Sequence, residues 1–321
     1  MSLRVCAVAV AAAVAGSGAI QAQTLTVATT QPGSLTHSLG SAVAKVISEQ
    51  AHLKVVVQPQ GSSALPPIAA KSADFGFSNS YDVVFFVTGT GEYTGRGKQP
   101  NIRVVARMIP NLSPMLVRAN SDIKSVKDLK GKRVPGGFAS QKSIRQSILA
   151  HLVNAGLTYD DVKEVLAPNV VKSADDFMAG KVDAFTFGLG AAKLKEVTAS
   201  VGPLRALPMQ TDPAAIARMQ AVLPTAYMLT MKPLPIWPEI HEPMPIMAFD
   251  MTMQTNADVP DDVVYKVVKA MHDNAPDMAA TFAGLKQFKA NAMAIKYDKL
   301  TYHPGAIRYY TEIGQWPPKE Q

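Results

Sequence analysis

Cysteine is almost absent from this chain of 321 residues, and the single one, Cys6, lies close to the start. If the first residues are removed on maturation, disulfide bonds cannot stabilise the mature protein, and thiol catalysis and Cys/His zinc sites are excluded. Stability must then come from buried apolar side chains. A chain of this length can build one or two domains with cores of their own.

Sequence signatures of catalysis and nucleotide binding are also missing. No G-x-S-x-G nucleophile elbow and no P-loop occurs, and Gly89-Thr-Gly91 is too short for a dinucleotide fingerprint. The histidines are scattered and lack an evident acid partner. Paired acids such as Asp160 and Asp161 stand where helices are expected to begin, and carboxylates cap helices there. We therefore expect no enzyme, no cofactor and no metal site.

Charged residues make up only 18% of the chain, and the formal net charge of +7 is not gathered in a dense Lys/Arg run. The densest group, from Lys124 to Arg133, is interleaved with acids and apolar residues, which is typical of a solvated face. We therefore expect no nucleic-acid partner. The basic balance favours an acidic small molecule instead.

The first 22 residues have the layout of a secretory signal peptide. Arg4 gives a positive start, Val5 to Ile20 is uncharged and rich in Ala and Val, and small residues follow. Cleavage after Ala22 fits best, with Ala19 as the alternative. Loss of Arg4, the one charged residue in this segment, would lower the net charge from +7 to +6. Because the apolar run is marginal for crossing a bilayer, we interpret it as a cleaved signal and expect a soluble periplasmic protein. We also expect the protein to be a monomer.

The expected mature chain opens with alternating strand and helix patterns. We expect strands at Leu25–Ala28, Lys54–Val57 and Asp74–Phe77, because these runs are short and β-branched or aromatic. The apolar spacing predicts helices at Ser38–Gln50 and Leu65–Ala70. This rhythm indicates a mainly parallel sheet with helices on its faces.

A second unit with the same rhythm follows. In this unit and in the part of the chain that leads back to the first unit, we expect strands at 104–108, 115–118, 132–134, 164–166, 183–187 and 248–255. We expect helices at 141–154, at 213–222, at 260–274 and from residue 276. Because the chain crosses between the units more than once, we expect two lobes around a cleft. Lobe I would comprise residues 23–117 and 254–321, and lobe II residues 118–253.

Polar residues gather in the loops that follow expected strands. Ligands of open α/β sheets bind beyond the carboxyl ends of the strands, near helix N-termini, so we expect these loops to bind the ligand. Their donors and one cation, Lys142, suit a carboxylate or another small oxyanion. Ordinary turns, and a solvated lysine at a helix start, are the alternative interpretation. The candidate ligand-binding residues are Ser34, Thr36, His37, Gly61, Ser62, Ser63, Asn79, Ser80, Tyr81, Ser140, Gln141, Lys142, Ser143, Phe187 and Gly188.

Six segments, in fixed order, carry a family resemblance. The most specific is Val117–Val134, which contains the motif Lys-Asp-Leu-Lys-Gly-Lys. The others are Ser72–Ser78, Thr88–Gly95, Arg103–Arg107, Ala155–Asp161 and Val182–Phe185. Together they resemble the TAXI receptors of TRAP transporters, and the resemblance runs from Leu25 to the end of the chain.

The resemblance implies a type 2 periplasmic binding-protein fold, in which two lobes of mixed, mostly parallel sheet flanked by helices enclose a ligand cleft. It also implies capture of a solute without turnover and its delivery to TRAP membrane permease subunits. The family's ligands are amino acids and dicarboxylates such as glutamate or 2-oxoglutarate, which implies a small organic anion. A sensor of the same fold that signals to a membrane kinase or chemoreceptor is the alternative, followed by a periplasmic enzyme.

The candidate loops depart from the family pattern. The usual Gly-Gly-Thr-Tyr-Tyr-Pro loop reads Gly33-Ser-Leu-Thr-His-Ser38 here and lacks the paired aromatics, while Gly61-Ser-Ser63 keeps only part of a Gly-Gly-Ser loop. Tyr81 stands where an Asp is common, with Asp82 next to it, and Ser140-Gln-Lys-Ser143 replaces Gly-Ser-Gly-Thr. We therefore expect this protein to share the family's role, and the altered loops leave the identity of its ligand open.

Overall fold

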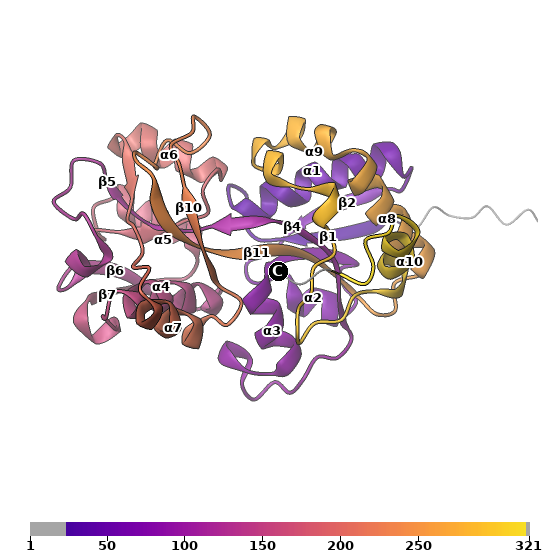
Figure 1. The fold of residues 1–321 in the computed structure, drawn as a ribbon, viewed down its shortest axis with the longest axis horizontal. Coiled ribbons are helices and arrows are strands. Elements are labelled where there is room, and N and C mark those ends of the chain that lie inside the picture. The colour runs from indigo at the N-terminus through magenta and orange to yellow at the C-terminus, as the bar shows by residue number, and fades with distance from the viewer. Residues whose placement is uncertain (1–23, 319–321) are drawn as a thin grey trace, which may run out of the picture.

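Two lobes lie side by side in the computed structural model, which describes residues 24–318 (Figure 1). The expected signal peptide therefore lies outside the described residues. Two long strands, β4 (Ile102–Leu112) and β11 (Met244–Asn256), run from one lobe to the other and pair with each other in antiparallel fashion. The two-lobed α/β architecture expected from the sequence is confirmed.

The first lobe is built on a sheet with the order β10-β11-β3-β1-β2. Its strands β2, β1 and β3 are parallel, whereas β11 runs antiparallel to β3. The elements of this lobe are β1 (Leu25–Thr29), α1 (Leu35–Gln50), β2 (Val55–Pro59), α2 (Leu65–Ala69), β3 (Phe75–Asn79), α3 (Ser80–Thr88), the 3-10 helix η1 (Gly91–Tyr93), α8 (Asp261–Asp273), α9 (Ala275–Thr281), η4 (Ala283–Gln287), η5 (Ala290–Ala292) and α10 (Pro304–Glu312).

The second lobe has a smaller parallel share than expected. Strands β6 and β7 are parallel, but β5 pairs antiparallel with both β8 and β9. Strand β10 pairs with β11 and so joins the sheet of the first lobe. The elements between β4 and β11 are β5 (Met115–Arg118), η2 (Val126–Leu129), β6 (Arg133–Gly137), α4 (Lys142–Asn154), η3 (Tyr159–Asp161), β7 (Lys163–Ala167), α5 (Val170–Met178), β8 (Phe185–Thr186), α6 (Ala192–Val201), β9 (Leu204–Ala206), α7 (Pro213–Val222) and β10 (Tyr227–Met231).

Helix α1 shows how the sequence fixes the edge of the cleft. The side chain of Ser34 caps the helix by accepting a hydrogen bond from the backbone N–H of His37. Leu39 and Val43 are fully buried against the sheet, and each such side chain contributes about 1.5–3 kcal/mol. Gly40 permits this close approach, since a Cβ atom there would lie 2.3 Å from a methyl carbon of Thr29. The N-terminus of α1 is thereby held beside the end of β1.

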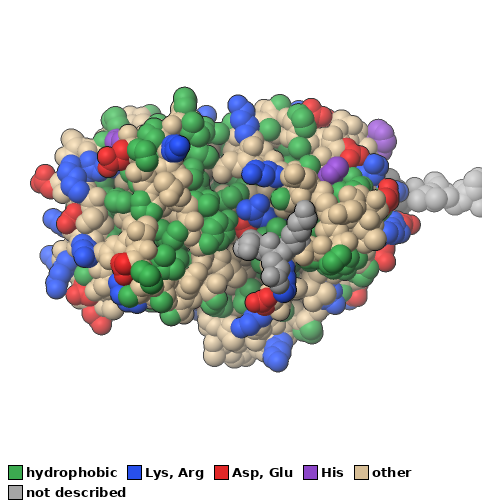
Figure 2. Space-filling view, in the orientation of Figure 1, with side chains coloured by type: hydrophobic (Ala, Val, Ile, Leu, Met, Phe, Trp, Pro, Cys, Tyr) green, Lys and Arg blue, Asp and Glu red, His purple; other side chains and the backbone are tan. Residues whose placement is uncertain are grey.

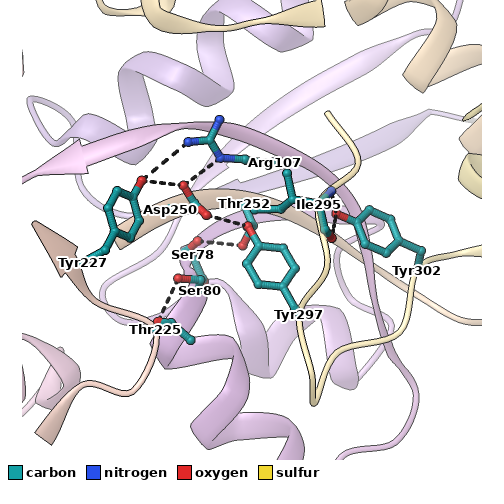
Figure 3. Close-up of polar contacts among 10 residues, drawn as sticks. All are labelled: Ser78, Ser80, Arg107, Thr225, Tyr227, Asp250, Thr252, Ile295, Tyr297 and Tyr302. Atoms are coloured by element: carbon teal, nitrogen blue, oxygen red, sulfur yellow. Dashed lines mark hydrogen bonds and ion pairs between the residues drawn. The ribbon is translucent and has the colours of Figure 1, made fainter. Parts of the chain in front are cut away.

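A buried polar cluster ties together the strands that connect the lobes (Figure 3). Arg107 of β4 donates from Nε to Oδ1 of Asp250 in β11 over 2.7 Å, and Asp250 is only 2% exposed. The hydroxyls of Tyr227 and Tyr297 also donate to this carboxylate, over 2.9 and 3.0 Å. The cluster thus links β4, β10, β11 and the segment after η5. Strands β4 and β11 pass through both lobes, so neither strand marks a sharp boundary between them. The lobe boundaries at residues 117 and 254 stay a prediction.

No helix within residues 24–318 is long and apolar enough to cross a membrane. On the face drawn in Figure 2, hydrophobic side chains gather over the middle, around β10 and β11. Of the large hydrophobic side chains in the described range, only Val56, Leu166 and Leu234 are exposed, and they lie in separate parts of the chain. Single exposed hydrophobic residues of this kind are common on protein surfaces.

Candidate ligand-binding cleft

A cavity of about 220 Å³ is lined by residues of both lobes. It is smaller than the pockets of roughly 300–1,000 Å³ that hold drug-sized ligands, so it suits a small solute. The structure brings all four candidate loops to its wall. The predicted residues that line it are Ser34, Thr36, Ser62, Ser63, Asn79, Ser140, Gln141, Lys142, Ser143, Phe187 and Gly188.

Four predicted residues do not line the cavity. Gly61 is exposed. His37 lies on α1 with Nδ1 3.1 Å from Oγ1 of Thr29, and burial lowers its pKa, so it supplies no cation at neutral pH. Ser80 and Tyr81, expected in a loop, begin helix α3 instead and are buried.

Tyr81 joins the two lobes. Its ring packs edge-on against Phe249 with centroids 4.8 Å apart, and its hydroxyl donates to the backbone oxygen of Ser143 over 3.3 Å. Ser80 makes a similar link, because its hydroxyl donates to that of Thr225 over 3.0 Å. These two side chains therefore hold α3 against the second lobe, whereas the adjacent residues Asn79 and Asp82 line the cavity.

A cluster of three hydroxyls lines the cavity where β1 leads into α1. Oγ1 of Thr30 donates to Oγ of Ser34 over 2.8 Å and lies 2.5 Å from Oγ1 of Thr36. The backbone N–H of Thr30 donates to the Thr36 hydroxyl over 3.1 Å. The sequence indicated Ser34 and Thr36 but not Thr30, which directly follows the strand. The three hydroxyls present rotatable donors at the helix N-terminus.

An amide network fixes a second part of the wall. Nδ2 of Asn111 donates to Oδ1 of Asn79 over 2.9 Å, and Oγ of Ser113 donates to Oδ1 of Asn111 over 2.7 Å. The Thr186 hydroxyl donates to the backbone oxygen of Ser113 over 2.9 Å. All four residues line the cavity. The sequence analysis did not select Asn111 and Ser113, because they lie at the end of β4, outside the polar loops from which the candidates were chosen.

Two cations line the cavity, Lys142 at the first turn of α4 and Arg96 after η1. Both side chains are exposed, and neither forms an ion pair with another described residue. The N-termini of α1, α3 and α4 also contribute lining residues, and each helix N-terminus carries partial positive charge. These features favour an anionic group on the ligand.

Two carboxyl groups, Asp82 and Glu92, also line the cavity, and the sequence pattern had not selected them. Asp82 is 4% exposed and accepts hydrogen bonds from the hydroxyls of Tyr93 (2.9 Å) and Ser63 (3.3 Å). Burial, and then the negative charge of Glu92, raises the pKa of Asp82 well above its ordinary value. Asp82 therefore holds its proton more readily than an isolated carboxyl would.

Ser147 is the last addition to the site. It lines the cavity one helical turn after Ser143, is 2% exposed, and its Oγ has no hydrogen-bond partner among residues 24–318. Its backbone oxygen lies 2.8 Å from Nδ1 of His151, whose pKa burial lowers to about 4. That histidine is therefore neutral at physiological pH. Within the same described range, no group of three or more His, Cys, Asp or Glu side chains is placed to hold a metal ion.

The sequence pattern of the NMT1-like family matches residues 27–314. The chain belongs to the NMT1-like family. Among solved structures, this NMT1-like protein is similar to the periplasmic binding protein BugD, with a TM-score of 0.59, 12% identity, and coverage of 93% of this chain and 99% of that one. The likeness shows a shared fold.

Two further structures share that fold with the NMT1-like protein. PhnD1 from Prochlorococcus marinus, in complex with methylphosphonate, has a TM-score of 0.55 at 12% identity, covering 91% of this chain and 98% of that one. The amino acid ABC transporter substrate-binding protein AbpA from Streptococcus pneumoniae, bound to L-arginine, has a TM-score of 0.51 at 13% identity, covering 82% and 95%. At such identities the likeness speaks for the architecture alone.

Proposed function

We propose that this NMT1-like protein is a periplasmic solute receptor. It captures a small organic anion in the cleft between its lobes, does not convert it, and delivers it to a membrane transporter. One observation carries the proposal: hydroxyl, amide and cationic side chains from both lobes surround one small cavity at several helix N-termini. A solute held from both sides favours the closed arrangement, which is how a receptor reports that it is loaded.

The anionic character rests on Lys142, Arg96 and the helix N-termini. A hydrogen bond to a charged partner contributes about 1.5–3 kcal/mol, about twice a neutral one. Dicarboxylates and acidic amino acids, the ligands implied by the TAXI resemblance, have the matching charge. The carboxyl groups of Asp82 and Glu92 also line the cavity, so a strongly charged anion such as phosphate suits it less well than a weakly charged one.

For the transporter, we propose permease subunits of the TRAP type. The ordered segments from Ser72 to Phe185 support this assignment through their resemblance to TAXI receptors. An ABC transporter is the second candidate, and the likeness in fold to AbpA favours it. Uptake measured in membrane vesicles with the purified receptor separates the two. Dependence on an ion gradient without ATP supports a TRAP permease, and dependence on ATP supports an ABC transporter.

A thermal-shift screen of organic acids and amino acids against the mature protein tests solute capture. A ligand that binds only the folded state at about 100 times its Kd stabilises it by about 2.7 kcal/mol. We expect small acids to raise the melting temperature, and a shift from neutral compounds alone would contradict the anionic assignment. Incubation with the best ligand should yield no product, which separates a receptor from an enzyme. Normal uptake in cells that lack the protein would favour the sensor alternative.

A further inference from the structure

Two chains of hydrogen bonds lead from the first lobe to the start of α4, one on each side of Lys142. The first chain reaches Gln141, the residue before Lys142, and the second reaches Ser143, the residue after it. All three of these residues belong to the second lobe and line the cavity. The cation in the cavity wall is therefore tied to the first lobe through both of its neighbours.

The first chain runs through two glutamine side chains. Oε1 of Gln141 accepts from the backbone N–H of Val170 at the start of α5 over 2.9 Å, and its Nε2 donates to Oε1 of Gln31 over 3.5 Å. Nε2 of Gln31 donates in turn to the backbone oxygen of Gly61 over 2.9 Å. Each amide accepts at its oxygen and donates at its nitrogen, so turning either one over would break both of its bonds. The chain therefore fixes the orientation of both side chains.

The second chain begins at the end of β4. Oγ of Ser113 donates to Oδ1 of Asn111 over 2.7 Å, and Nδ2 of Asn111 donates to Oδ1 of Asn79 over 2.9 Å. Nδ2 of Asn79 donates to the hydroxyl of Tyr81 over 3.2 Å, and that hydroxyl donates to the backbone oxygen of Ser143 over 3.3 Å. All of these bonds run in one direction, toward α4.

The bond that crosses between the lobes is the longest one in each chain. It measures 3.5 Å from Gln141 to Gln31 and 3.3 Å from Tyr81 to Ser143, whereas the other bonds measure 2.7 to 3.2 Å. Strong N–H···O bonds span about 2.7–3.2 Å and O–H···O bonds about 2.5–3.0 Å. A small further approach of the lobes would strengthen both crossing bonds, and a separation would break them while the other bonds remain.

We propose that Gln31 is a positioning residue for solute binding, which holds the first turn of α4 so that Lys142 meets the solute. Gln31 is not among the residues that line the cavity, so it acts through its bond to Gln141. A solute bound by Lys142 and by the first lobe favours the arrangement in which this bond forms, and the bond in turn favours the bound state. The inference rests on the proposed function, because it presupposes that the cleft captures a solute that reaches Lys142.

Gln31→Met tests the role, because methionine keeps the length of the side chain and removes its amide. Stopped-flow binding uses L-glutamate and glutarate as probes. We expect koff to rise roughly 2- to 10-fold, the range of one neutral hydrogen bond, with kon unchanged because the bond forms only as the lobes close. Gln31 is half-exposed, so thermal unfolding should match the wild type. The control Gln60→Met removes a bond made within the first lobe, from Nε2 to the backbone oxygen of Gln58, and should leave both rates unchanged.

A double change separates positioning from mere attachment of the lobes. If Gln31 acts through Lys142, the effect of Gln31→Met on koff should be largely absent in Lys142→Gln, and the two changes should not be additive. Additive effects, an unchanged koff in Gln31→Met or a loss confined to kon would each overturn the proposal and leave the receptor function standing.

A second readout needs no ligand. Glu49→Cys on α1 and Lys127→Cys on η2 place labels at exposed positions in different lobes, and a chain expressed from residue 23 has no other cysteine. Energy transfer between the labels should show a ratio of closed to open protein that falls roughly 2- to 10-fold in Gln31→Met and stays unchanged in Gln60→Met. An unchanged ratio in Gln31→Met would overturn the proposal. Failure of both acids to bind would count against the proposed function, and the label distance would still test the bond between the lobes.

Discussion

Replacement of His151 by Asn should reduce the loss of stability that the protein undergoes between neutral and mildly acidic pH. His151 is fully buried on α4, with Nδ1 2.8 Å from the backbone oxygen of Ser147 and Nε2 unpartnered within the described chain. Burial lowers its pKa from 6.5 to about 4. Asn keeps a donor near the Nδ1 position and removes the group that titrates.

The direction of the pH effect on stability follows from the pKa of His151 in the unfolded chain, 6.5, and in the folded protein, about 4. The unfolded chain takes up a proton on this histidine below pH 6.5, whereas the folded protein does so only near pH 4. The stability contributed by the neutral imidazole is therefore complete above pH 6.5 and is lost as the pH falls toward 4. One pKa unit corresponds to about 1.4 kcal/mol, so the loss between about pH 7.5 and pH 5 is roughly 2 kcal/mol.

Urea unfolding at about pH 7.5, 6.5 and 5 measures this loss. Other groups titrate in the same range, so the informative quantity is the difference between the wild-type protein and His151→Asn, expected to be roughly 2 kcal/mol. The exposed His241, changed to Asn, is the matched control and should follow the wild type. If His151→Asn loses as much stability as the wild type, His151 does not stay neutral in the folded protein and the reasoning fails.

Three further changes test the site, the connecting strands and the packing. Lys142→Gln should weaken binding of the anionic ligand roughly 10- to 100-fold without lowering stability, as measured by calorimetry and thermal unfolding. Asp250→Ala should cost about 3–5 kcal/mol in urea unfolding because it leaves Arg107 without its carboxylate, and the double change Arg107→Met with Asp250→Ala should cost less. Gly305→Ala should destabilise by about 1–3 kcal/mol because its Cβ would lie 2.2 Å from a backbone oxygen of α8, whereas Gly61→Ala, with open space around it, should not.

Much of the first lobe could be predicted because its signals are local. Strand β1, helix α1 and strand β3 were each expected within a few residues of their observed bounds, from apolar spacing and turn residues alone. Helix α3 was missed because Ser80–Thr88 is rich in valine and phenylalanine, which favour strands. Burial of Val83 and Phe86 against neighbouring elements outweighs that preference.

The same error hid the acidic part of the site. Ser80 and Tyr81 were interpreted as part of a loop and expected to face the ligand. They begin helix α3 instead, and it is Asp82 in the first turn of this helix that lines the cavity. A single acid inside an apolar helix was the available signal, because such a residue rarely stays buried without a partner. Glu92 had no comparable signal, since its position depends on how η1 folds back onto α3 and α4.

Ser80 and Tyr81, which were predicted to bind the ligand and instead join the two lobes, explain how the cleft can respond to a solute. The hydroxyl of Tyr81 reaches Ser143, and that of Ser80 reaches Thr225, so the lobes are joined beside the cavity by hydrogen bonds of 3.3 and 3.0 Å. Each contributes only about 1 kcal/mol net, which is comparable to a single contact with a ligand. A solute that bonds to both lobes adds such contacts in the closed arrangement only, and it can therefore shift the equilibrium toward closure. Ligand contact and lobe contact are thus divided between neighbouring residues at the start of α3.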